Sequence, residues 1–125
     1  MRKRDEAILQ EHLCHWLEAK GILYTASMVG VYLPVRYAVM RKRMGVKAGH
    51  PDIVIYEPRG KYHALFIELK IGGYPTQEQK EWQSILNEKG YLALIMPPDL
   101  VEFNEAFAWC RNKIENYILQ GREGY

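Results

Sequence analysis

Two short apolar runs joined by a turn constrain this chain more than any other feature of its sequence. The runs are DIVIY at residues 52–56 and HALFIELK at residues 63–70, and between them lies EPRGK at residues 57–61. β-Branched and aromatic residues favour strands, whereas Pro and Gly favour turns. We therefore expect two adjacent antiparallel strands that form a hairpin.

This hairpin would bring three charged side chains to one place. Side chains alternate between the two faces of a strand, so Glu68 and Lys70 share a face. In a hairpin the start of the first strand, at Asp52, lies near the end of the second. We expect Asp52, Glu68 and Lys70 to converge there.

Two neighbouring carboxylates repel each other and raise each other's pKa unless a cation lies between them. With no Cys or His cluster nearby, oxygen ligands suit Mg²⁺ or Mn²⁺ rather than Zn²⁺. A lysine beside such a metal can help to deprotonate an attacking water and offset charge growing on a phosphorus-centred transition state. A salt bridge between Lys70 and either carboxylate explains these three residues equally well.

The rest of the chain predicts a mixed sheet flanked by helices. Helices are expected at residues 5–20, 76–90 and about 99–120, and further strands at residues 29–35 and 91–96. The order α, β, β, β, α, β, α indicates an α/β fold, because a strand, helix, strand passage implies a parallel crossover. A single domain covering residues 1–125 accounts for the length.

The first predicted helix carries a carboxylate on its apolar side. Leu9, Leu13 and Leu17 fall on one face, and Glu6 projects onto the middle of that face. Glu11 points the other way, where an ordinary surface carboxylate belongs. Glu6 therefore needs an explanation.

A cluster of positive charge follows the strand predicted at residues 29–35. Residues 36–50, which we call the basic strip, contain five cations and no acidic residue. The formal net charge is +2, so subtracting these five charges leaves the remainder at −3. We expect loop or irregular structure here. Binding of a phosphate backbone and simple solvation both explain the composition.

Taken in order, these motifs resemble the PD-(D/E)XK nuclease superfamily and, more narrowly, its VRR-NUC family of virus-type replication-repair nucleases. That family pairs an N-terminal helix bearing a Glu with a G-x-P-D strand, an E-x-K strand and a following helix with a Gln. This chain has Glu6, GHPDIVIY, FIELK and PTQEQKEW in that order, across roughly residues 5–96. A bare PD…ExK pattern is common by chance, whereas the whole ordered set is much more specific.

The resemblance implies a restriction-endonuclease-like core and a role for each matching residue. It makes Asp52 and Glu68 ligands of Mg²⁺ or Mn²⁺, with the main-chain carbonyl of Leu69 assisting, and Lys70 the catalytic lysine. It also makes Glu6 a ligand. A Glu at a helix start is independently favoured by the helix macrodipole, and Glu11 is the alternative ligand if the helix is rotated.

The remaining candidates are less specific. Thr76 and Gln79 have capping-box spacing, while the resemblance places a Gln near the site, and the two interpretations of Gln79 are not exclusive. His50 is a candidate for a phosphate contact, although a loop histidine is more often simply exposed. Our candidates for contacts to the DNA backbone are Arg41, Lys42, Arg43 and Lys47.

The resemblance implies a metal-dependent, structure-specific DNA endonuclease that favours branched DNA such as four-way (Holliday) junctions. Symmetric cutting of a junction needs two active sites, so we expect a C2 homodimer. The alternative is a non-catalytic nucleic-acid-binding module with a nuclease-like fold. Sequence-specific restriction ranks last, because it needs a recognition domain that this short chain lacks.

The cysteines and the hydropathy of the chain indicate the cellular compartment. Cys14 and Cys110 form no C-x-x-C pair, and we expect two buried thiols. No apolar run approaches the roughly 20 residues that span a bilayer, and no signal-peptide core follows the N-terminus. We expect a cytoplasmic, nucleoid-associated protein of a bacterial or phage-infected cell, without a membrane partner.

Overall fold

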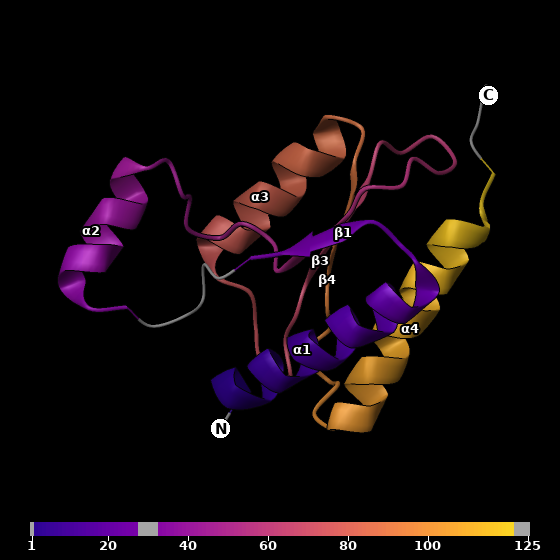
Figure 1. Ribbon diagram of the computed structural model, residues 1–125, viewed down its shortest axis with the longest axis horizontal. Coiled ribbons are helices and arrows are strands. Elements are labelled where there is room, and N and C mark those ends of the chain that lie inside the picture. The colour runs from indigo at the N-terminus through magenta and orange to yellow at the C-terminus, as the bar shows by residue number, and fades with distance from the viewer. Residues whose placement is uncertain (1, 28–32, 122–125) are drawn as a thin grey trace.

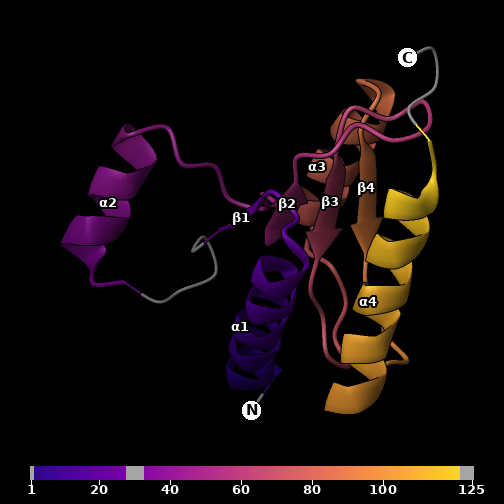
Figure 2. The same cartoon turned by 45° about the vertical axis from the view of Figure 1, so that its right-hand side comes forward.

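The described residues form a four-stranded sheet with helices on both faces and one further helix beside it, an arrangement that Figures 1 and 2 show. The computed structural model describes residues 2–27 and 33–121. The elements are α1 (Arg2–Lys20), β1 (Tyr24–Ala26), α2 (Val35–Arg43), β2 (Ile53–Ile55), β3 (Leu65–Glu68), α3 (Gln77–Glu88), β4 (Leu92–Ile95) and α4 (Phe103–Leu119).

The sheet has the strand order β1-β2-β3-β4. β2 and β3 are antiparallel, with Ile53 opposite Ile67, as the hairpin prediction requires. β3 and β4 are parallel and are joined through α3, which confirms the predicted crossover. The α/β fold class with a mixed sheet is therefore confirmed.

Alternation along the strands divides the core between the two faces of the sheet. Ile53, Ile55 and Ile67 are fully buried among residues of α1 and α4, including the predicted stripe Leu9, Leu13 and Leu17. Val54, Phe66 and Ala93 belong to a smaller cluster against α3. Figure 2 shows α1 and α4 in front of the sheet and α3 behind it.

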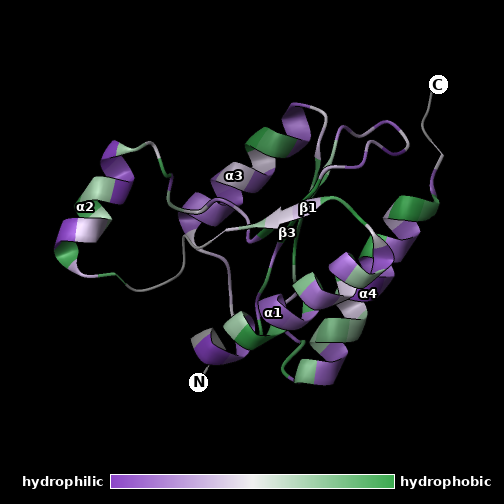
Figure 3. Ribbon diagram, viewed as in Figure 1, coloured by the Kyte–Doolittle hydropathy of each residue, from purple (hydrophilic) through white to green (hydrophobic). Residues whose placement is uncertain are grey.

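The basic strip was predicted wrongly as irregular structure, because much of it forms α2. No α2 residue is buried, and Figures 1 and 3 show this helix apart from the others, with polar and apolar residues intermixed. The strand expected at residues 29–35 lies largely outside the described residues, and its last residue, Val35, begins α2 after Pro34. That strand's C-terminal end is therefore corrected to a helix start.

The remaining helix and strand predictions hold with small changes of boundary. α1 begins at Arg2 rather than at residue 5, and β1, a three-residue strand, was not predicted. Cys110 is buried as expected, whereas Cys14 is only partly so, and both thiols are free. Within the described residues, none of the helices combines the length and the apolar character needed to cross a bilayer.

Candidate active site

Two carboxylates meet where β2 begins and β3 ends. Asp52 directly precedes β2, Glu68 is the last residue of β3, and the pairing of the two strands brings these ends together. The main-chain N–H of Leu69 donates to Asp52 Oδ2 at 2.7 Å. Glu68 is only 5% exposed, the one charged side chain among the buried residues of the described chain.

Burial changes the acidity of both groups. It raises the pKa of Asp52, although the hydrogen bond from Leu69 opposes this rise. Burial, and then the negative charge of Asp52, raise the pKa of Glu68 to about 9, while the charge of Lys70 lowers it. The fold thus holds two carboxyl groups where two negative charges are unfavourable without a compensating cation or proton.

Glu68 shows that this pair fits a divalent cation. Its Oε2 accepts a hydrogen bond from Gln79 Nε2 at 3.0 Å, whereas its Oε1 is buried without a partner in the described part of the chain. An unpaired, buried carboxylate oxygen is costly, and a hard cation such as Mg²⁺ or Mn²⁺ takes carboxylate oxygens as ligands. The donor set therefore fits such an ion.

The carboxylates do not enclose an ion by themselves. Across residues 2–27 and 33–121, no group of three or more His, Cys, Asp or Glu side chains forms a metal site. A small divalent cation commonly binds through one or two carboxylates and keeps several waters. The pair Asp52 and Glu68 therefore fits a cation that is held by two carboxylates and by water, rather than one enclosed by protein side chains.

Glu6 joins the site from another element. Its Oε2 accepts a hydrogen bond from the main-chain N–H of Ile71 at 2.9 Å, which ties α1 to the segment after β3. The charge of Glu6 also contributes to the raised pKa of Glu68. Glu11 is more exposed, yet it lines the same cavity.

A cavity of about 500 Å³ lies over these groups. The predicted residues that line it are Glu6, His50, Asp52, Glu68, Lys70 and Gln79. No carboxylate oxygen of the described residues lies within 4.0 Å of the Lys70 ammonium, so the salt bridge considered as the alternative is not formed. The Lys70 side chain is therefore available to a molecule in the cavity.

Gln79 has both of the roles that its position suggested. Its Oε1 accepts from the N–H of Thr76 at 2.9 Å, and its own N–H donates to Thr76 Oγ1 at 3.2 Å, which completes a capping box. Its Nε2 reaches Glu68. One amide thus closes the start of α3 and holds one oxygen of a buried carboxylate.

The predicted backbone-binding residues are not brought to the carboxylates as a group. Arg41, Lys42 and Arg43 form the last turn of α2, which lies to one side of the sheet in Figure 2. Lys47 lines a second cavity, and His50 lines both cavities. Of the five cations of the basic strip, Lys47 alone follows α2, and the cavity that it lines shares Ser27 and His50 with the carboxylate cavity.

Several participating groups were not predicted. The main-chain N–H groups of Leu69 and Ile71 donate to Asp52 and Glu6, and these contacts are known only once the segment after β3 is placed against β2 and α1. Gly49 has a φ of +86°, and a Cβ there would lie 2.7 Å from the main-chain carbon of Glu78. The absence of a side chain at Gly49 therefore lets the segment before Asp52 approach α3 closely. The glycine of the G-x-P-D motif was the sequence feature that could have predicted this approach.

Comparisons with known proteins identify the family of this fold. No family model and no curated protein sequence matches the chain. A solved structure of a VRR_NUC domain protein superposes with a TM-score of 0.70 at 32% sequence identity, over 93% of this chain and 89% of that one. With that identity over nearly the whole of both chains, the protein belongs to the VRR-NUC family.

Proposed function

We propose that this chain is a metal-dependent DNA endonuclease, a single nuclease domain over residues 1–125, with branched DNA as its favoured substrate. The observation that carries the proposal is the pair of the partly buried Asp52 and the buried Glu68, with an unpaired oxygen on Glu68 and with Lys70 lining the same cavity. Membership of the VRR-NUC family supports the coarser statement that the domain is of the nuclease type.

Asp52 and Glu68, with the carbonyl of Leu69, are the proposed ligands of Mg²⁺ or Mn²⁺, and Glu6 is the proposed ligand from α1. When bound, the cation would lower the pKa of a coordinated water and offset negative charge on the phosphate. The Leu69 N–H holds one oxygen of Asp52, and Gln79 holds one oxygen of Glu68, which fixes both carboxylates in the lining of the cavity.

Lys70 is the proposed catalytic lysine. Its ammonium can orient the attacking water and stabilise the negative charge that grows on the phosphate as the P–O bond breaks. Gln79 is the proposed positioning residue, because it acts through Glu68. His50, which lines the same cavity, is a proposed contact to phosphate when its ring carries both hydrogens, because only then does Nε2 donate.

Branched DNA and a C2 homodimer form the finer part of the proposal. A four-way junction presents two symmetry-related cleavage positions, and each chain offers one carboxylate pair in its described residues, so two copies are required. Arg41, Lys42, Arg43 and Lys47 are the proposed contacts to the DNA backbone, where cations position the substrate without reading its sequence.

The test is cleavage of a labelled four-way junction beside a linear duplex and a single strand of the same sequence. Each is incubated with Mg²⁺, with Mn²⁺ or with chelator. Wild type is expected to cut the junction only with metal, and Lys70→Ala to be slower by roughly 10²- to 10⁴-fold. Lys89→Ala, which removes an exposed lysine beyond the end of α3, is the matched control and should cut normally.

Each part of the proposal has its own contradicting outcome. Equal cleavage by Lys70→Ala or Asp52→Ala would refute this site. Equal cutting of duplex and junction would refute the preference for branched DNA alone. Tight junction binding without cutting in either metal would instead support the non-catalytic binding module.

A further inference from the structure

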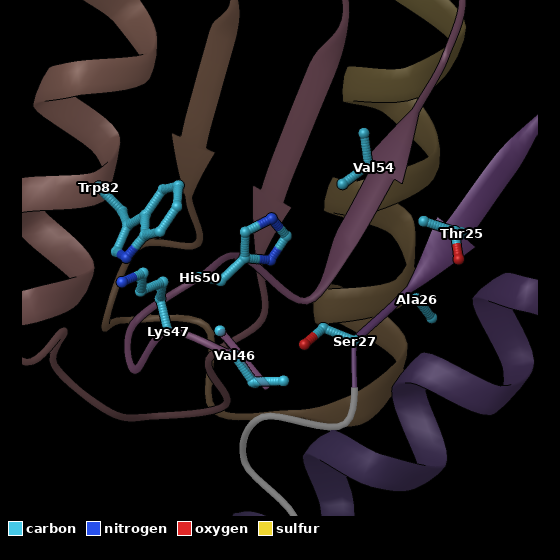
Figure 4. Close-up of a pocket in the computed structure, with 9 residues that line it drawn as sticks. Thr25, Ala26, Ser27, Val46, Lys47, His50, Val54 and Trp82 are labelled. Carbon is cyan, nitrogen blue, oxygen red and sulfur yellow. The ribbon is translucent and has the colours of Figure 1, made fainter. Parts of the chain in front are cut away.

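A second cavity adjoins the one that holds the carboxylates. Its volume is about 320 Å³, at the lower end of the roughly 300–1,000 Å³ typical of small-molecule sites. Ser27 and His50 line both cavities, so the two are neighbours. Figure 4 shows Trp82 and His50 on one side of this second cavity and Val54 and Thr25 on the other.

The cavity exists because α3 covers only half of its sheet face. Thr25 pairs with Val54, Val54 with Phe66 and Phe66 with Ala93, so these four side chains form a row across the sheet. α3 packs on Phe66 and Ala93. At the other end of the row Thr25 is exposed, and the chain at residues 45–50 borders the space above Val54.

The aromatic wall of this cavity is held in position. The His50 ring lies edge-on to Trp82, with centroids 5.1 Å apart, and to Phe66 at 6.0 Å. The Trp82 indole N–H donates to the carbonyl of Ala48 at 3.0 Å. His50 Nδ1 lies 2.8 Å from the carbonyl of Pro51. Since a carbonyl only accepts, Nδ1 carries the hydrogen, and Nε2 of the neutral ring is an acceptor.

We propose that this cavity binds one unpaired nucleobase of the DNA strand whose phosphate lies at the carboxylates. The inference rests on the proposed function, which supplies the strand. A flat heterocycle suits rigid aromatic rings opposite valine and threonine side chains, and such stacking tolerates any base because every base has a π-face. His50 Nε2 offers an acceptor to a base N–H group, such as N3–H of thymine, and Lys47 offers a cation to an adjoining phosphate.

This pocket would favour DNA in which a base is already unstacked. Extruding a base from an intact duplex costs several kcal/mol, and the cost is smallest where the base is already unpaired. Branch points and bulges provide such bases. The pocket therefore gives a physical basis for preferring interrupted DNA over continuous duplex.

The test compares two duplexes that differ only by one base. One has a single bulged thymidine, and the other has an abasic nucleotide at the same bulge, so their phosphates are identical. Affinities are measured by fluorescence anisotropy in chelator, where no cleavage occurs. Wild type is expected to bind the bulged thymidine about tenfold more tightly, within the range measured for base stacking on aromatic side chains.

Filling the pocket should abolish this difference. Thr25→Trp puts an indole on the open end of the row, and Val46→Trp fills the cavity from outside the sheet if the strand variant does not fold. Both are expected to bring the affinity ratio close to one. Leu23→Trp, which adds the same side chain at a residue 63% exposed just before β1 and outside the cavity lining, should keep the wild-type ratio.

A wild-type ratio of one would overturn the pocket, and so would an unchanged ratio in a folded filling variant. The cleavage assay separates this failure from failure of the proposed function. Cleavage without base discrimination refutes the pocket alone, whereas discrimination without cleavage refutes the nuclease and leaves the pocket. Absence of binding to either duplex refutes the pocket as well.

Discussion

At the scale of single residues, Glu68 is the most informative group in the molecule. A buried carboxylate beside a second one, with one oxygen unpaired, destabilises the fold that contains it. Such an arrangement is characteristic of functional sites, where stability and activity oppose each other. Removing the charge should therefore stabilise the protein while it impairs the site.

We predict that Glu68→Gln unfolds at a higher temperature than wild type in chelator. The gain in the free energy of unfolding should be about 1–3 kcal/mol, because the Gln amide carries no charge and its N–H can donate to the neighbouring Asp52, so the buried atom is no longer unsatisfied. Mg²⁺ or Mn²⁺ should raise the melting temperature of wild type but not of the variant. Glu115→Gln, at an exposed residue of α4 outside the lining of both cavities, is the matched control and should keep the metal response.

The same group gives wild type a pH dependence of known sign. The pKa of Glu68 is raised in the folded state from the ordinary 4.5 to about 9, so folding favours the protonated form. Its contribution is complete below pH 4.5 and is lost as the pH rises toward 9. In chelator the melting temperature should fall more steeply over this interval in wild type than in Glu68→Gln. Equal slopes in thermal melts would contradict the assignment.

Residue-level chemistry was predictable wherever strand geometry determined it. The alternation of β3 and its pairing with β2 were enough to bring Asp52, Glu68 and Lys70 together. The main-chain partners of Asp52 and Glu6 were not predictable, because the N–H groups of Leu69 and Ile71 carry no sequence signal, whereas Gln79, the side-chain partner of Glu68, was expected near the site. The unpaired oxygen of Glu68 is likewise visible only once every neighbour is known.

At the scale of elements, α2 and β1 show why parts of the fold were missed. Arg, Lys, Met and Ala favour helices intrinsically, but α2 buries no residue and so lacks the apolar periodicity used to recognise one. β1 has only three residues, too few for alternation to be recognised. The helices that pack on the sheet were predicted because their apolar residues recur at helical spacing along one face.

The start of α3 allows its two functions to be separated. Gln79→Glu keeps an acceptor for the Thr76 N–H but replaces the donor to Glu68 by a further carboxylate beside Asp52 and Glu68. We expect near-normal helix capping and a loss of cleavage of at least about tenfold. Thr76→Ala should show the reverse, losing about 1 kcal/mol of stability with near-normal cleavage at a temperature where it is folded. Equal effects in melting and cleavage assays would refute this separation.

α2 makes a separate prediction about substrate affinity. Replacing Arg41, Lys42 and Arg43 by Gln should weaken binding to every DNA sequence and reduce the slope of log affinity against log salt, by about 0.9 for each phosphate that is no longer neutralised. Stability should not change, because none of the three is buried. The control replaces Lys89, Arg111 and Lys113, so both variants go from a net charge of +2 to −1. Identical salt slopes in the two variants would remove α2 from the interface.

At the scale of the whole molecule, the two faces of the sheet have different tasks. The face under α1 and α4 contains the larger core and the Glu6 contact, so it supports the carboxylates rigidly. The other face is covered only in part by α3, which leaves the second cavity open. Both cavities lie at the end of the sheet where β2 begins, so one strand of DNA can occupy both.

That arrangement gives one chain one cleavage site, which leads to the prediction of a dimer. One chain has a mass of 14.6 kDa, so analytical ultracentrifugation of the free protein should give a dimer mass of 2 × 14.6 = 29.2 kDa. With a four-way junction bound, the mass should rise by that of one junction. A dimer of one wild-type and one Lys70→Ala chain, isolated with two affinity tags, should nick one strand, whereas the wild-type dimer should cut both. Sedimentation as a monomer at assay concentration would contradict the dimer. Paired cuts by the mixed dimer would show that one site serves both strands, contrary to the symmetry argument.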